Sequence, residues 1–114
     1  MVIMHPKQRE VYLAEFPYSG LSSLKLRPTL VLTNEKFNEE TGLCIICMIT
    51  SNPTHPYSHP LSDSDLEYGK FLGHSSFVIY GSVFTMDSSK LAKRILKVKA
   101  QKFSEISEKL KGII

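Results

Sequence analysis

Residues 43–49 read Leu-Cys-Ile-Ile-Cys-Met-Ile, an apolar run that no polar residue interrupts. Gly42 precedes the run and Thr50-Ser51 follows it, so turn-forming residues bound it on both sides. A continuous apolar run of this length is typical of a buried strand, whereas a buried helix is usually longer. We therefore predict that these residues form a central strand of the fold.

The sequence on both sides of this run predicts further short strands. Residues 10–16 alternate loosely between apolar and polar side chains, and residues 29–33 are rich in aliphatic and β-branched side chains. Pro28 stands just before the second of these strands, where a missing backbone N–H is tolerated. Residues 76–84 and 95–98 have the same character and complete the predicted set of strands.

Short helical turns and one longer helix are expected between and after the strands. Asn34 can cap a single turn through residue 37 that Gly42 closes, and Asp87 can cap another over residues 88–92. At the C-terminal end, apolar side chains recur at spacings of three and four, as one face of an amphipathic helix requires: Phe103, Ile106, Leu110 and Ile113. Gly112 is a natural end for that helix.

These elements predict a mostly β (α+β) fold, a small twisted antiparallel sheet or barrel closed by the C-terminal helix. A parallel sheet would need more crossover helices than the chain offers. The 114 residues fit a single domain, 1–114, with no room for a second hydrophobic core. Residues 17–23 and the proline-containing residues 51–60 are expected to be exposed loops.

Composition and charge limit the possible environments and partners. Hydrophobic residues make up 42% and charged residues 22%, which is typical of a globular chain and excludes a disordered one. The net charge of +3 permits a polyanionic partner, and residues 90–111 hold seven lysines and one arginine against two glutamates. This basic region is either a solvated face or a binding surface. No apolar run approaches the roughly 20 residues that span a bilayer, and no signal peptide is evident, so we expect a cytoplasmic protein.

Two cysteines and two histidines raise the possibility of a zinc site. Cys44 and Cys47, followed by His55 and His59, have the ligand types of a Cys₂His₂ centre. However, the segment between the two pairs is shorter than the roughly 12 residues expected in such sites. Positions i and i+3 of a strand also point to opposite faces, so one metal could not bind both sulfurs. We therefore predict core-filling free thiols and no metal.

A small set of polar residues could carry chemistry. Pro28 holds Arg27 in an extended conformation, in which the guanidinium forms a rigid fork suited to phosphate. Thr50 and Ser51 follow the buried run, where small polar residues contact ligands or cap turns. From these residues alone, a surface ion pair for Arg27 and a turn cap for Thr50 remain open.

The frame that holds these residues resembles the MazF/PemK toxin family. The resemblance rests on Phe16-Pro17, Arg27-Pro28 with Leu30-Val31-Leu32-Thr33, Thr41-Gly42-Leu43, Ile49-Thr50-Ser51, and Val83-Phe84-Thr85-Met86-Asp87 with Leu91, Arg94 and Ile95. These pieces lie in the family's order over roughly residues 9–111. The resemblance implies an SH3-like barrel, a homodimer, cleavage of single-stranded RNA without a cofactor, and restraint by an antitoxin protein.

The resemblance also implies roles for individual residues. Arg27 and Thr50 would be catalytic, and Ser51, Lys25, Ser19 and His74 would bind substrate. RNA carries its own nucleophile, the 2′-OH, so the enzyme must position the chain, move protons and neutralise the crowded phosphorane. Because the pKa of arginine exceeds about 12, charge stabilisation is the role that suits Arg27.

The chain departs from the family pattern where acid–base residues are expected. The usual Gly-Asp that opens the first strand is Arg9-Glu10, and positions that are arginine and aspartate in some members are Ile79 and Gly81. A member that binds RNA or antitoxin without cutting is therefore an alternative. A second alternative is a gyrase-binding toxin similar to CcdB, to which the ending Gly112-Ile113-Ile114 bears a faint likeness.

Overall fold

The computed structural model describes residues 5–17, 24–71 and 75–114. Strands and helices follow one another along the chain in this order: β1 (Glu10–Pro17), β2 (Leu24–Val31), α1 (Glu35–Thr41), β3 (Leu43–Thr50), β4 (Ser58–Leu61), the 3₁₀ turn η1 (Asp63–Asp65), β5 (Leu66–Tyr68), β6 (Ser76–Asp87), the 3₁₀ turn η2 (Ser88–Lys90), β7 (Leu91–Val98) and α2 (Ala100–Lys111).

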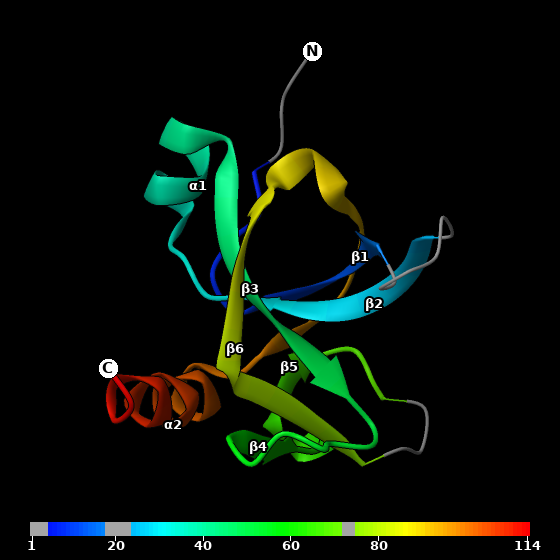
Figure 1. Cartoon of the computed structure of the whole chain (residues 1–114), viewed down its shortest axis with the longest axis vertical. Helices are drawn as coiled ribbons and strands as arrows, with labels where there is room; N and C mark the ends of the chain where they lie inside the picture. The colour runs from blue at the N-terminus through cyan, green and yellow to red at the C-terminus, as the bar shows by residue number, and fades with distance from the viewer. Residues whose placement is uncertain (1–4, 18–23, 72–74) are drawn as a thin grey trace.

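The strands form a single seven-stranded sheet in the order β4-β6-β3-β2-β1-β7-β5. Every strand pairing is antiparallel. The sheet curls strongly and forms a half-barrel, as Figure 1 shows. The predicted mostly β, antiparallel barrel with a C-terminal helix is confirmed.

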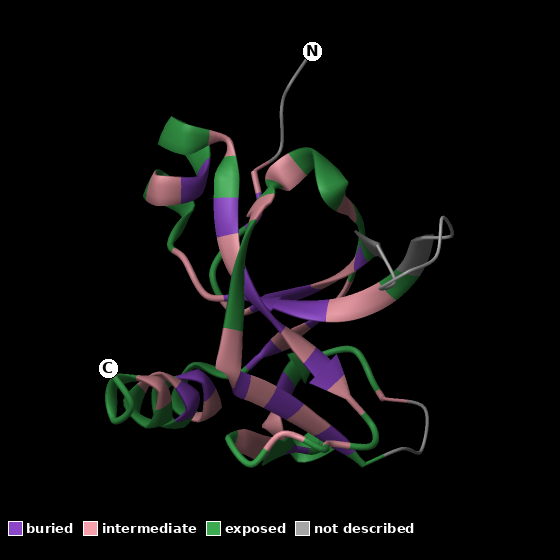
Figure 2. Ribbon diagram, viewed as in Figure 1, coloured by how far each residue is buried: buried purple, intermediate pink, exposed green. Residues whose placement is uncertain are grey.

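Side chains are buried on both faces of β3, which explains its uninterrupted apolar sequence. Cys47 and Ile49 belong to the larger core cluster, which Phe103 and Ile106 of α2 also enter. Cys44 and Ile46 belong to a second cluster on the opposite face of the strand. A strand covered on both faces reads as a continuous apolar run, and Figure 2 shows buried residues concentrated along β3 and its neighbours.

The helix ends lie where the sequence predicts them. The Asn34 side chain accepts a hydrogen bond from the Phe37 backbone N–H at 2.8 Å, and Gly42 ends α1 with a φ of 71°. The helix continues to Thr41, so it is longer than the single turn expected. Gly112 is the C-cap of α2. None of the helices in the described residues is long and apolar enough to cross a membrane.

Several strand boundaries were predicted wrongly. β2 begins at Leu24, so Pro28 lies within the strand rather than before it, and β6 and β7 are both longer than expected. The last residues of the predicted loop 51–60 form β4 instead. β4 is an edge strand with a paired strand on one side only, so the missing backbone N–H of Pro60 is tolerated. Most of the other predicted loop, residues 18–23, lies outside the described residues.

Candidate functional site

Arg27 and Thr50 are brought to the same face of the sheet by the register of β2 and β3. The two strands pair through Thr29 with Met48, Leu30 with Cys47 and Val31 with Ile46. The paired residues end there; Arg27 and Thr50 each lie two residues beyond the Thr29–Met48 pair, and residues two apart on a strand share a face. Arg27 also lies beside Ala14 of β1 and is partly exposed. The strands that carry the two residues predicted to be catalytic are therefore neighbours in the sheet, and alternation along the strands places both residues on the same face.

Thr50 is the last residue of β3, and its hydroxyl is oriented by the turn that follows. The Thr50 Oγ1 atom accepts a hydrogen bond from the Asn52 backbone N–H at 3.2 Å. The hydroxyl hydrogen remains able to donate, since the hydroxyl has one donor and two acceptor positions. Ser51 lies in the exposed bend beside it. The turn cap and a ligand-binding role for Thr50, which were posed as alternatives, are thus compatible.

The remaining predicted substrate-binding residues are only partly placed. Lys25 lies in β2 opposite Phe16 of β1, so its backbone is on the same strand as Arg27. Ser19 and His74 lie outside the described residues.

The cysteines and histidines of the possible zinc site are not brought together. Cys44 and Cys47 belong to different core clusters on opposite faces of β3, as the strand geometry predicts. Burial raises the pKa of the Cys47 thiol to about 12 and also raises that of Cys44. His55 accepts a hydrogen bond from the Tyr57 backbone, and His59 faces Glu105 of α2. No group of three metal-ligating side chains occurs among the described residues.

A buried carboxylate on β1 is the centre of a polar cluster. The Glu10 side chain is 3% exposed. It accepts hydrogen bonds from the Lys7 backbone at 2.7 Å, the Tyr12 hydroxyl at 2.9 Å and the Arg94 guanidinium at 3.0 Å. The guanidinium of Arg94 also lies over the ring of Tyr68, 5.8 Å from its centroid. Glu10 therefore has a structural role, because its carboxylate accepts hydrogen bonds from three other residues.

The ionisation of Tyr12 reflects this environment. Burial, followed by the hydrogen bond to Glu10, raises the pKa of the Tyr12 phenol well above its ordinary value. The phenol therefore stays protonated and keeps donating to the carboxylate. The sequence identified Glu10 as an acidic residue at the start of a strand, but it gave no signal that Arg94, far along the chain, would be its partner.

Comparison with protein families gives one match over nearly the whole chain. The model described as "PemK-like, MazF-like toxin of type II toxin-antitoxin system" matches residues 7–114. The chain belongs to this toxin family. Among curated proteins, none matches the chain.

Solved structures of MazF proteins share this toxin fold. A MazE-MazF crystal structure from Deinococcus radiodurans (form II) is 25% identical with a TM-score of 0.78, over 97% of this chain and 96% of that chain. MazF alone from the same organism (form I) is 26% identical with a TM-score of 0.72, over 97% of each chain. An endoribonuclease in complex with its cognate antitoxin, from a Mycobacterial species, is 17% identical with a TM-score of 0.74, over 96% of this chain and 93% of that chain. Family membership and fold thus agree with the resemblance in the sequence.

Proposed function

We propose that this MazF-like chain is an endoribonuclease that cuts single-stranded RNA without a metal ion. In the proposed reaction the 2′-OH attacks the adjacent phosphorus, its proton is removed, and the 5′-oxygen of the next nucleotide leaves with a proton. The products are a 2′,3′-cyclic phosphate and a 5′-OH end. The observation that supports the proposal is the pairing of β2 with β3, because it favours a common face of the sheet for Arg27 and Thr50.

Each residue of this pair has a role that suits its chemistry. The planar guanidinium of Arg27 can pair with two phosphate oxygens, so it stabilises the developing phosphorane. Thr50 donates its hydroxyl hydrogen to a non-bridging oxygen, and the Asn52 backbone N–H fixes the position of the Oγ1 atom. Ser51 and Lys25, next to these residues in sequence or on the same strand, extend the phosphate-binding surface.

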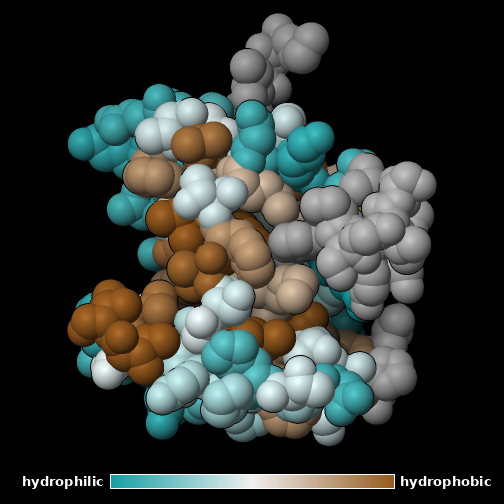
Figure 3. Space-filling model, viewed as in Figure 1, coloured by the Kyte–Doolittle hydropathy of each residue, from teal (hydrophilic) through white to brown (hydrophobic). Residues whose placement is uncertain are grey.

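We also propose that the active form is a cytoplasmic homodimer restrained by an antitoxin. β4 pairs only with residues 76–79 of β6, so the described part of β6 from Val83 onward pairs with β3 alone. Val83 is 44% and Phe84 41% exposed. Figure 3 shows apolar surface over the C-terminal end of α2 and across the middle of this face. Exposed apolar surface beside an open strand edge is typical of an interface between subunits.

The antitoxin is proposed to bind the basic rim around Lys25 and Arg27. An acidic, partly disordered segment could occupy this rim and imitate the RNA backbone. The Deinococcus radiodurans structure contains MazF together with MazE, which supports a protein partner of this type. A complex in which the antitoxin lies far from Arg27 would contradict the proposed site.

The decisive experiment is cleavage of a mixed RNA pool by purified protein in the presence of EDTA, with sequencing of new 5′ ends. We expect defined cuts with 5′-OH ends. Arg27→Ala should reduce the rate about 10²- to 10³-fold, as loss of one transition-state donor does. Thr50→Val should also reduce the rate, whereas Thr50→Ser, which keeps the hydroxyl, should retain most of it. Lys36→Ala, which removes an exposed positive charge on α1, should have no effect.

Two other outcomes would favour the alternative functions. Intact RNA from a folded dimer that still binds antitoxin would identify a binding-only member of the family. Toxicity that survives Arg27→Ala but is lost on truncation at Gly112 would favour a gyrase-binding toxin.

A further inference from the structure

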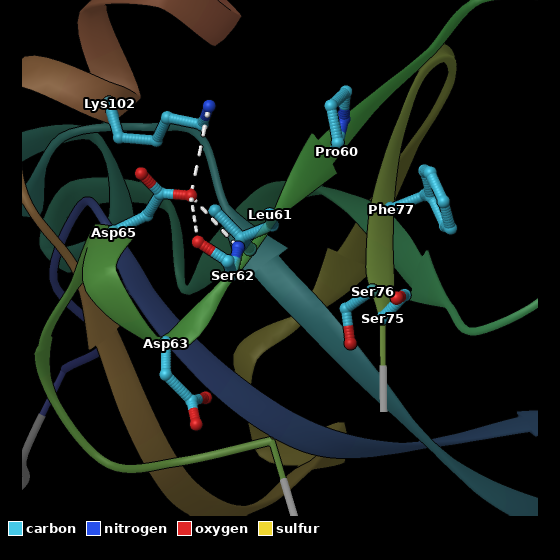
Figure 4. A pocket seen from close by; sticks show the side chains of 9 residues that line it. All are labelled: Pro60, Leu61, Ser62, Asp63, Asp65, Ser75, Ser76, Phe77 and Lys102. Carbon is cyan, nitrogen blue, oxygen red and sulfur yellow. Dashed lines mark hydrogen bonds and ion pairs between the residues drawn. The ribbon is translucent and has the colours of Figure 1, made fainter. Parts of the chain in front are cut away.

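A pocket opens where β4 ends and β6 begins, beside the proposed cleavage site. It has a volume of about 560 Å³. Ser62, Asp63 and Asp65 line it from the segment after β4, Ser75 and Ser76 from the start of β6, and Lys102 from α2 (Figure 4). None of these residues belongs to the Arg27–Thr50 pair, so the pocket is a separate feature of the surface.

The sheet places this pocket next to Thr50. Thr50 of β3 pairs with Phe77 of β6, and Phe77 pairs with Pro60 of β4. Phe77 and Pro60 both line the pocket. Since neighbouring strands lie about 4.8 Å apart, the pocket begins about one strand spacing from Thr50 and extends to the next. A nucleotide whose phosphate is held at Thr50 would therefore lie within one or two strand spacings of the pocket.

One wall of the pocket is fixed by interactions within the protein. The Asp65 Oδ2 atom accepts a hydrogen bond from the Ser62 backbone N–H at 2.8 Å. The same oxygen lies 3.7 Å from the Lys102 ammonium group, which also lies 3.3 Å from Glu105. Figure 4 shows the Asp65, Ser62 and Lys102 side chains meeting in this network. Asp65 and Lys102 therefore offset each other's charge and hold the wall in place.

Asp63 differs from Asp65 because it keeps acceptor capacity. Its Oδ1 atom accepts a hydrogen bond from the Phe71 backbone N–H at 2.9 Å. Its other oxygen accepts no hydrogen bond from any other described residue. An ionised carboxylate has about four acceptor positions, so Asp63 can take further donors from a ligand. The hydroxyls of Ser75 and Ser76 stand across the pocket and can either donate or accept.

We propose that this pocket binds the base of the nucleotide next to the cut, and that it prefers guanine. The proposal rests on the proposed ribonuclease function and adds a base preference to it. The Watson–Crick edge of guanine presents two adjacent N–H donors, which fit the free acceptor positions of Asp63, beside an oxygen that a serine hydroxyl can approach. No other RNA base presents two adjacent ring and amino donors. Phe77 and Pro60, which pair across β6 and β4, border the pocket on the side of Thr50.

Binding to uncleavable RNA tests the pocket separately from the nuclease. The probes are fluorescent 2′-O-methyl RNA heptamers of uridine in which the central position is guanosine, adenosine, cytidine or uridine. Such RNA lacks the free nucleophile, so it reports binding whether or not the protein cuts. We expect the wild-type protein to bind the guanosine heptamer about ten-fold more tightly than the others, which is within the range that one bidentate base contact provides.

The variant to measure is Asp63→Asn, and its matched control is Glu108→Gln. Glu108 is an exposed residue of α2 that pairs with Lys111, and Glu108→Gln, like Asp63→Asn, removes one negative charge. Both variants should bind RNA somewhat more tightly overall because repulsion falls. The readout is therefore the ratio of affinities for guanosine and adenosine. We expect this ratio to fall at least five-fold in Asp63→Asn and to stay unchanged in Glu108→Gln.

Three results would overturn the pocket proposal: equal affinity of the wild type for all four heptamers, no binding of any of them, or an unchanged ratio in a folded Asp63→Asn protein. If Asp63→Asn does not fold, NMR titration of the wild type with guanosine 5′-monophosphate replaces it. Shifts at the Ser75, Ser76 and Phe77 amides support the pocket, and their absence refutes it. Cleavage without a guanine preference refutes the pocket alone, whereas guanine preference without cleavage refutes the nuclease alone.

Discussion

Replacing Tyr12 with phenylalanine removes one hydroxyl from the network around Glu10 and tests whether that network stabilises the fold. The hydroxyl donates to Glu10 Oε1 at 2.9 Å, and the carboxylate is almost completely buried. A hydrogen bond to a charged group contributes about 1.5–3 kcal/mol. The carboxylate keeps its bonds to Lys7 and Arg94, so the lower part of this range applies. We expect Tyr12→Phe to lower the free energy of unfolding by about 1.5–2 kcal/mol.

Urea denaturation of the variant alongside Tyr80→Phe measures this quantity. Tyr80 is the matched control because its ring is also well buried, at 9% exposure, while its hydroxyl makes no hydrogen bond with another described residue. Tyr80→Phe should change the free energy of unfolding by less than about 0.5 kcal/mol. The m-value should be unchanged in both variants, which would show that the denatured state is unaffected.

Glu10→Gln tests whether the effect of Tyr12 acts through the carboxylate. A neutral amide can still accept the hydroxyl hydrogen, but it loses the charge that strengthens the bond and pairs with Arg94. Tyr12→Phe should therefore cost less in the Glu10→Gln background, with a coupling free energy of about 0.5–1 kcal/mol between the two sites. Equal destabilisation by Tyr12→Phe and Tyr80→Phe, or zero coupling with Glu10, would refute the reasoning.

Three further substitutions or labelling experiments follow from the structure. Burial raises the pKa of the Cys47 thiol to about 12. The contribution of this thiol to stability is therefore complete below about pH 9 and declines as the pH rises toward 12. A thiol reagent at pH 8 should modify Cys47 only after the protein unfolds, which mass spectrometry can show. Gly69→Ala should destabilise by more than about 2 kcal/mol in thermal denaturation because the new Cβ would overlap Leu96 Cβ, whereas Gly42→Ala, with positive φ but open space, should cost about 1 kcal/mol. Asn38→Ala should lower the free energy of unfolding by about 2–4 kcal/mol, measured by urea denaturation. The buried Asn38 amide donates to the Pro6 and Thr33 carbonyls and accepts from the Thr33 hydroxyl. A variant as stable as the wild type would contradict this role.

Local features of the sequence were sufficient to predict most of the elements. The apolar run 43–49, the caps at Asn34 and Asp87, and the apolar spacing from Phe103 depend only on nearby residues. β4 and β5 were missed because they are short edge strands with a proline or charged residue among them. Ile113, by contrast, has the helical spacing but lies beyond the end of α2 and is 43% exposed, because periodicity does not show where the core ends.

The proposed sites depend on information that no local pattern contains. Arg27 and Thr50 share a face of the sheet only because β2 and β3 pair in one register; a shift of one residue would send one of the two side chains to the other face. The resemblance to the toxin family could identify both residues because members of a family share the same strand pairing. It could not indicate the pocket, where Asp65 and Lys102 meet because α2 lies against the turn after β4. The residues of a family's shared site can thus be inferred from resemblance, whereas a chain's own base preference has to be found in its three-dimensional structure.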